Sequence, residues 1–388
     1  MTMLKQIAAV SLLNIKSLKA RLWSSLVIVV GMTAVIAVLI SMMSFTTGYV
    51  ESEMKAGDPM RALILSSGLE NENESRLTRD QAALITDAPG IRKDVDGAPL
   101  AEGEGLITTP ALRKTGVPTQ VIIHGFGPKG FALRPEIKIV SGRMFRPGAQ
   151  EILVGKAAQD RLARMAIGDK VILPNGTWPI VGVFSAGGDL LEGQLIADRD
   201  TLMSTVKRGD FNIVIARLES PDAMDRFKAA LAGNASLQVM AERESDYYDH
   251  LSAGDRALFS EVAYLTGGIM ALGAMFGALK IMVGAVRARR QEIGTLRALG
   301  FGALPVAISV VSECLLLALT GTLIGSAIAW LTFDGAQGTY WETLFDLKVT
   351  PGLIGLGILW ALAIALLGSL VPAIRAARLP IVEALRAV

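Results

Sequence analysis

The stretch "VRARRQEIGTLRALGFG", residues 286–302, is a short charged segment enclosed by long uncharged ones. It holds four arginines and one glutamate, and it follows 18 uncharged residues, 262–279. A helix through it places Ile293, Leu296 and Leu299 on one side. Arg290, Gly294 and Arg297 share another side, Arg289 and Glu292 stand close enough to pair, and Gly300 and Gly302 end the helix because glycine accepts the positive φ of a C-terminal cap.

The segments on either side of this helix are long enough to cross a membrane. Between Arg21 and Glu51 lie 29 uncharged residues, and between Lys348 and Arg375 lie 26. About 20 apolar residues suffice for a bilayer. The composition, 51% hydrophobic and 19% charged, would also suit a soluble protein, but the distribution of these residues would not. We therefore expect four membrane-spanning helices, at residues 22–47, 260–284, 304–332 and 350–373.

Some features inside the spans have two interpretations. Glu313 lies within the third span, either as a helix contact or hinge, or as a protonated or snorkelling residue near the interface. Glycines at four-residue spacing would allow close helix packing, although apolar spans contain many glycines anyway. The pairs are Gly273 with Gly277 and Gly321 with Gly325. The first span has no cleavage site of the small-x-small type, so we expect it to remain as an anchor.

Basic residues indicate the orientation of the spans. They precede the first span (Lys5, Lys16, Lys19, Arg21), occupy the charged segment and follow the fourth span. Positive residues favour the cytoplasmic side, so both termini, the segment 285–303 and the tail 374–388 are expected there. Residues 48–259 and the short loop 333–349 then lie outside. The net charge of +2 reflects this asymmetry and not a nucleic-acid surface.

The large outer segment predicts a mixed α+β domain with helical stalks at its ends. "LTRDQAALI" predicts a helix capped by Thr78, and "GKAAQDRLARM" a second helix. Five stretches read as strands: "TQVIIHGF", "EILVG", "DKVIL", "WPIVGVF" and "FNIVIARL". Pro128 in "GFGPKG", residues 125–130, and Pro135 after it argue against a helix that could hold a pyrophosphate.

The chain offers no pattern for catalysis. His124 and His250 lack metal-site spacing, the single cysteine Cys314 lies in a span, and GxxxxGK[ST] occurs nowhere. We expect no catalytic, cofactor or metal site. On these grounds the charged helix is either a positive-inside loop or a helix that docks on another protein.

Two motifs resemble the MacB/LolC/FtsX permeases, the type VII ABC transporters. "RRQEIGTLRALGFG", residues 289–302, is similar to their Arg-Arg-x-Glu-Ile-Gly-x-Leu-Arg-Ala-Leu-Gly signature, and "PAIRAARLPIVEALR", residues 372–386, to their C-terminal motif. The resemblance implies that the charged helix is a coupling helix that docks on an ATPase subunit. Its contact residues would be Arg289, Arg290, Glu292, Ile293, Leu296, Arg297 and Leu299.

The resemblance also implies a transporter complex of several subunits. Two such permeases, as homodimer or heterodimer, would bind two ATPases carrying ATP and Mg, and would move their periplasmic domains by mechanotransmission in a bacterial inner membrane. The segment 1–21 is amphipathic and short, so the ATPase is expected to be a separate polypeptide and this chain not an enzyme.

Three functions are then open. The first is export or extraction of a lipid, lipoprotein or amphiphilic compound, with a periplasmic adaptor as a further partner. The second is FtsX-like signalling that activates an extracytoplasmic hydrolase. The third, which omits the ATPase, is a membrane-anchored receptor.

Overall fold

The computed structural model describes residues 22–69, 71–340 and 343–380, and the amphipathic segment expected at 1–21 lies outside them. This part of the chain divides into two compact units. One contains four helices that are long and apolar enough to cross a membrane, and the other contains a mixed sheet. The expected fold class is confirmed. The four helices are α2 (Leu22–Ala56), α8 (Glu244–Ala288), α10 (Ala303–Phe333) and α11 (Pro351–Ala377).

Two of these helices, α2 and α8, extend far beyond the spans expected from the sequence. α2 continues nine residues past position 47, and α8 begins 16 residues before position 260. The added segments are polar, as in "SDYYDHLSAGDR", so they continue the helical hydrogen bonding without belonging in hydrocarbon. The helical stalks expected at both ends of the outer segment are therefore continuous with the first two spans.

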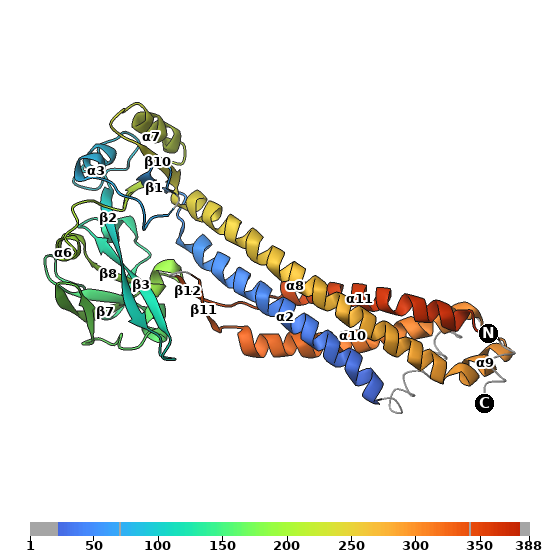
Figure 1. Cartoon of the computed structure of the whole chain (residues 1–388). Helices are drawn as coiled ribbons and strands as arrows, with labels where there is room; N and C mark the ends of the chain where they lie inside the picture. Colours follow the sequence, from blue (N-terminus) through green and yellow to red (C-terminus); the bar gives the residue numbers. More distant parts are fainter. Residues whose placement is uncertain (1–21, 70, 341–342, 381–388) are drawn as a thin grey trace. The chain divides into compact units, whose positions relative to one another are not determined.

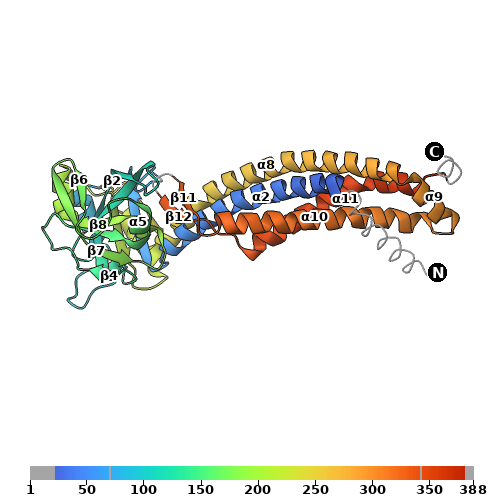
Figure 2. The same cartoon turned by 90° about the horizontal axis from the view of Figure 1, so that it is seen from below.

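The four long helices pack side by side around a core of small and branched residues (Figures 1 and 2). Ile36 and Ile40 of α2, Cys314 and Ala318 of α10 and Ala361 of α11 are all buried there. A short helix, α9 (Arg290–Ala298), connects α8 with α10 at one end of this helical unit.

The two glycine pairs of the spans differ in their surroundings. A Cβ placed on Gly321 would lie 2.6 Å from the carbonyl oxygen of Val29, and one on Gly325 2.7 Å from that of Thr33. The hydroxyl of Thr33 also donates to the carbonyl of Gly321 at 3.1 Å. A Cβ on Gly273 or Gly277 would meet nothing within 4 Å. The α10 pair therefore sets the close approach of α10 to α2, whereas the α8 pair does not serve packing of this kind within the described chain.

The outer unit is built on a ten-stranded sheet with the order β10-β1-β9-β2-β3-β8-β5-β7-β4, in which β6 pairs with β7. Two neighbouring pairs, β3 with β8 and β5 with β7, are parallel, and the others are antiparallel. Both faces of the sheet pack against hydrophobic clusters. Alternate residues of one strand enter different clusters, because successive side chains point to opposite faces. In β1, Ala62 and Ile64 enter one hydrophobic cluster while Leu63 and Leu65 enter another.

Five of the ten strands of the outer unit lie at the positions that the sequence indicates. The bounds of the strands are β1 (Arg61–Ser66), β2 (Ala101–Leu112), β3 (Pro118–Phe126), β4 (Lys138–Gly142), β5 (Ile152–Gly155), β6 (Lys170–Leu173), β7 (Gly176–Ser185), β8 (Leu195–Asp198), β9 (Ile213–Arg217) and β10 (Val239–Arg243). A separate hairpin between α10 and α11 consists of β11 (Gln337–Tyr340) and β12 (Thr343–Asp346). The helices are α3 (Arg79–Thr86), α4 (Gly130–Leu133), α5 (Lys156–Arg161), η2 (Leu190–Gly193), α6 (Arg199–Thr205) and α7 (Ala223–Ala232).

Three local predictions for helices have different outcomes. Thr78 caps α3 through a capping box with Gln81, as expected. α5 ends at Arg161, earlier than expected, because Leu162 turns into a bridge with Arg113. The expectation of no helix in "GFGPKG" is wrong by one turn. The short helix α4 starts at Gly130, where Glu102 accepts hydrogen bonds from the backbone N–H groups of Gly127 and Lys129.

The α2–α10 contact leads to a test of the glycine pairs. Gly325→Val should lower the midpoint of thermal unfolding in detergent by several degrees, because overpacking typically costs about 1–3 kcal/mol. Gly277→Val, on the open side of α8, is the matched control and should leave the midpoint nearly unchanged. Equal midpoints for the two variants would show that the α10 glycines are not needed for packing.

Candidate functional site

The candidate site is α9 and its contacts with the helices beside it. α8 ends at Ala288, and Arg289 leaves helical geometry, with φ −103° and ψ 16°. α9 ends in a Schellman motif: the N–H of Phe301 donates to the carbonyl of Leu296, and that of Gly300 to the carbonyl of Arg297. Gly300 has the positive φ, +93°, that this motif needs. The second expected stop residue, Gly302, instead precedes the first turn of α10 as its N-cap.

A buried ion pair holds the start of α9 against α10. The guanidinium of Arg289 donates to both carboxylate oxygens of Glu313, at 3.1 and 3.2 Å. Both side chains are only 6% exposed. The sequence suggested Glu292 as the partner of Arg289, but the ion pair in the structure is with Glu313. Of the alternatives left open for Glu313, the structure therefore favours a helix contact.

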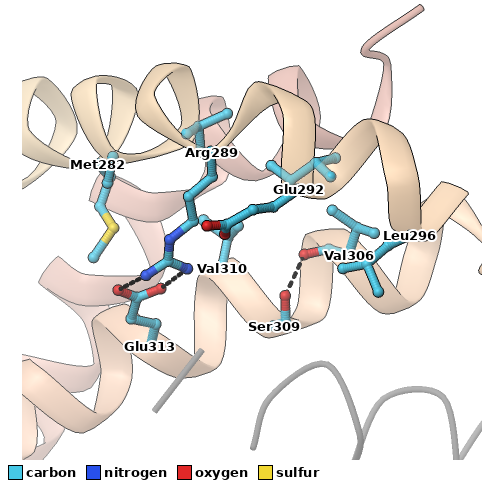
Figure 3. A pocket seen from close by; sticks show the side chains of 11 residues that line it. Met282, Arg289, Glu292, Leu296, Val306, Ser309, Val310 and Glu313 are labelled. Atoms are coloured by element: carbon cyan, nitrogen blue, oxygen red, sulfur yellow. Dashed lines mark hydrogen bonds and ion pairs between the residues drawn. The ribbon is translucent and has the colours of Figure 1, made fainter. Parts of the chain in front are cut away.

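The ion pair lies beside a cavity of about 30 Å³, room for a water molecule. Figure 3 shows Arg289 reaching from the α8–α9 junction to Glu313 on α10, with Leu296 and Val306 further along the same gap. The Glu292 carboxylate points toward this gap as well, although the side chain is exposed. Residues of α8, α9 and α10 line the cavity.

Two more residues of α9 contact neighbouring helices of this chain. Ile293 is buried in a cluster with Val306 and Val310 of α10 and Ala373 of α11. The guanidinium of Arg297 donates to the carbonyls at the end of α11, at 2.6 Å to Ala377 and 3.2 Å to Leu379. α9 therefore contacts α8, α10 and α11, and its orientation is fixed by this chain alone.

The expected contact residues divide into an inward and an outward group. Arg289 and Ile293 are buried, and Leu296 and Arg297 are half-buried. The exposed members of the expected set are Arg290, Glu292 and Leu299, called here the outward face of α9, and Glu292 also lines the cavity. Leu299 is 73% exposed. Within the expected set, these three side chains are the most open to a partner.

A network of buried charges in the outer unit was not foreseen from the sequence. Glu244, the first residue of α8, accepts from Arg61 of β1 at 2.5 Å, and its carboxylate lies 3.8 Å from Arg134. Arg134 pairs with Glu104 of β2, beside His124 of β3. Burial disfavours the charge of Glu104, but Arg134 and His124 lower its pKa below the usual range. The signal in the sequence was the charge of "AEGEG" within an otherwise apolar strand.

A second set of contacts in the outer unit joins the hairpin to the stalks. Asp255 of α8 accepts hydrogen bonds from the hydroxyls of Tyr49 on α2, at 3.0 Å, and Tyr340 on β11, at 3.1 Å. Arg161 donates to Asp346 of β12 at 2.5 Å. The hairpin that follows α10 is thereby bound to both stalk helices and to the sheet domain.

Comparison with known proteins matches two family models along the chain. Residues 24–233 match the MacB-like periplasmic core domain, and residues 264–381 match the FtsX-like permease C-terminal domain. The chain is 25% identical over 293 residues to the "Uncharacterized ABC transporter permease YknZ" of Bacillus subtilis (strain 168), covering 69% of this chain and 70% of the relative. The solved extracellular domain of the YknZ transporter from Gram-positive bacteria is matched over 99% of its length and 46% of this chain, with 14% identity and a TM-score of 0.35.

The buried ion pair is testable by removing one partner and then both. Glu313→Ala should destabilise the chain by about 3–5 kcal/mol, because it leaves the Arg289 charge buried without its carboxylate. Arg289→Met combined with Glu313→Leu should recover most of this loss. The measurement is the free energy of unfolding of the single and the double variant in mixed micelles. Glu292→Ala, which removes an exposed carboxylate nearby, is the control, and a Glu313→Ala variant as stable as this control would contradict the role of the pair.

Proposed function

Because this chain belongs to the MacB-like and FtsX-like ABC transporter permeases, we propose that it transmits the motion of an ATPase to a domain outside the membrane. The ATPase is a separate subunit that docks on the outward face of α9 and carries the ATP and Mg. The ATPase pattern GxxxxGK[ST] is absent from the 388 residues. The arginine asymmetry of the sequence supports a cytoplasmic position for α9.

The observation that carries this proposal is the continuity of α8. It is a single helix of 45 residues that starts directly after β10 of the outer unit and ends one residue before α9. At 1.5 Å per residue it is about 68 Å long, roughly twice the hydrocarbon thickness. A continuous helix is stiff along its axis, so a displacement of α9 is passed to its far end.

Both ends of α8 are fixed by buried charges. Glu244 binds Arg61 at the outer end, and Arg289, just past the last residue of the helix, binds Glu313 at the other. A buried pair resists separation because breaking it leaves a charge without compensation. We infer that these two pairs are the points at which force enters and leaves the helix.

The proposed cargo is a lipid, a lipoprotein or another amphiphilic compound, moved by the outer domain without passing between the spans. The described spans contain few polar groups, and Glu313 is neutralised by Arg289. Two copies of the permease, as homodimer or heterodimer, work with two ATPases in this proposal. Mass spectrometry of the lipids and proteins that co-purify with the wild-type complex identifies the cargo.

Docking is tested on the outward face. Leu299→Ala combined with Glu292→Ala should reduce retention of the co-expressed ABC ATPase by at least about tenfold, because buried apolar anchors at interfaces are often worth about 2 kcal/mol or more. The readout is the ATPase to permease ratio after purification, together with ATP turnover of the complex.

The matched control is Leu272→Ala, which truncates an exposed leucine of α8 away from α9 and should retain the ATPase fully. If the double variant retains the ATPase as well as Leu272→Ala does, α9 is an ordinary charged loop and the docking surface lies elsewhere.

A further inference from the structure

Arginines gather around the end of the helical unit at which α9 lies, and they fall into two groups. Arg289 and Arg297 bind groups of this chain. Arg289 pairs with Glu313, and Arg297 donates to the last carbonyls of α11. Four others line one groove between the ends of α8 and α11. They are Arg287, Arg290, Arg375 and Arg378.

This groove, called here the arginine groove, has a volume of about 450 Å³. Its walls are also apolar, with Val283 and Val286 on α8 and Ile374 on α11. No carboxylate is among the described residues that line it, and none of the four arginines forms an ion pair with a described residue. Four guanidinium groups around a partly apolar groove therefore lack a negative counterpart in the described chain.

Capping of helix ends does not account for these four arginines. Basic side chains at a helix C-terminus are favourable because they complement the free carbonyls. At the end of α11, however, Arg297 already donates to the carbonyls of Ala377 and Leu379. Arg375 and Arg378 are exposed on the groove side and remain available to a ligand.

We propose that the arginine groove binds the headgroup of an anionic phospholipid. Guanidinium groups bind phosphate oxygens through paired N–H donors, and basic pockets between the ends of membrane helices suit lipid phosphates. The apolar wall residues Val283, Val286 and Ile374 lie on the membrane-spanning helices, where they contact the start of an acyl chain. A free phosphate would use the arginines but not these walls.

The groove and the outward face of α9 share one residue, Arg290, so the variants that test lipid binding and ATPase docking both leave Arg290 unchanged. A bound lipid would bridge α8 and α11, two helices that α9 also contacts. It would thereby make the position of α9 depend on the composition of the surrounding leaflet.

The test is lipid binding to the full chain in detergent, followed by native mass spectrometry. Arg287→Gln combined with Arg378→Gln removes one cation from each helix and should weaken binding of phosphatidylglycerol by at least about tenfold. Lys280→Gln, an exposed cation of α8 outside the groove, is the matched control and should bind as the wild type does. Zwitterionic phosphatidylcholine should bind more weakly than phosphatidylglycerol to the wild type and equally to all three proteins.

Several results would overturn the proposal. Equal phosphatidylglycerol binding by the double variant and by Lys280→Gln would do so, as would equal affinity of the wild type for the two lipids. Displacement of phosphatidylglycerol by equimolar inorganic phosphate would make the groove a free-anion site. Unchanged lipid binding with loss of the ATPase from the double variant would make it part of a protein interface.

Discussion

The Arg289–Glu313 pair is the interaction on which the arrangement of α9 depends. α8 and α9 are separated by a single non-helical residue, and that residue is Arg289 itself. At such a break the angle between the two helices is set by side-chain contacts, and Arg289 lies at the junction itself. The bidentate contact with α10 fixes it, and burial makes the contact costly to break. The pair therefore turns a break in the helix into a defined angle.

A similar solution operates at the other end of α8. There the first helical residue, Glu244, meets Arg61 and Arg134, whose other partners belong to the sheet domain. Buried charges are poor sources of net stability but are specific in geometry, because misalignment leaves them unpaired. Helix ends that must transmit a displacement need defined geometry more than they need additional apolar contact. The proposed function therefore depends on buried charged residues that take no part in a chemical reaction.

The sequence predicted features that depend on local pattern. Long uncharged runs indicated the four spans, the alternating strands indicated the sheet, and Gly300 indicated the end of α9. Partners distant in the sequence were not predictable. Arg289 and Glu313 are 24 residues apart, and a nearer carboxylate, Glu292, offered an equally plausible partner. Only the packing of α8 on α10 decides between the two.

The same limit applies to the expected contact residues of α9. The periodicity grouped Ile293, Leu296 and Leu299 on one side, but a helix of nine residues joined to two long helices is covered unevenly by its neighbours. Ile293 is buried against α10 and α11, whereas Leu299 lies past their contact. Likewise, Glu102 lies more than 20 positions away and accepts hydrogen bonds from the residues that lead into α4, a contact that the prolines did not indicate.

The rigid attachment of α9 is the central claim, and a distance measurement tests it directly. Spin labels at Thr295→Cys on α9 and Thr320→Cys on α10, in a Cys314→Ala background, report the separation of the two helices; both labelled positions are exposed. A narrow distance distribution is expected in the otherwise unmodified chain, and a broad one when Glu313→Ala is added. A broad distribution before Glu313 is changed, or a narrow one afterwards, would contradict the claim.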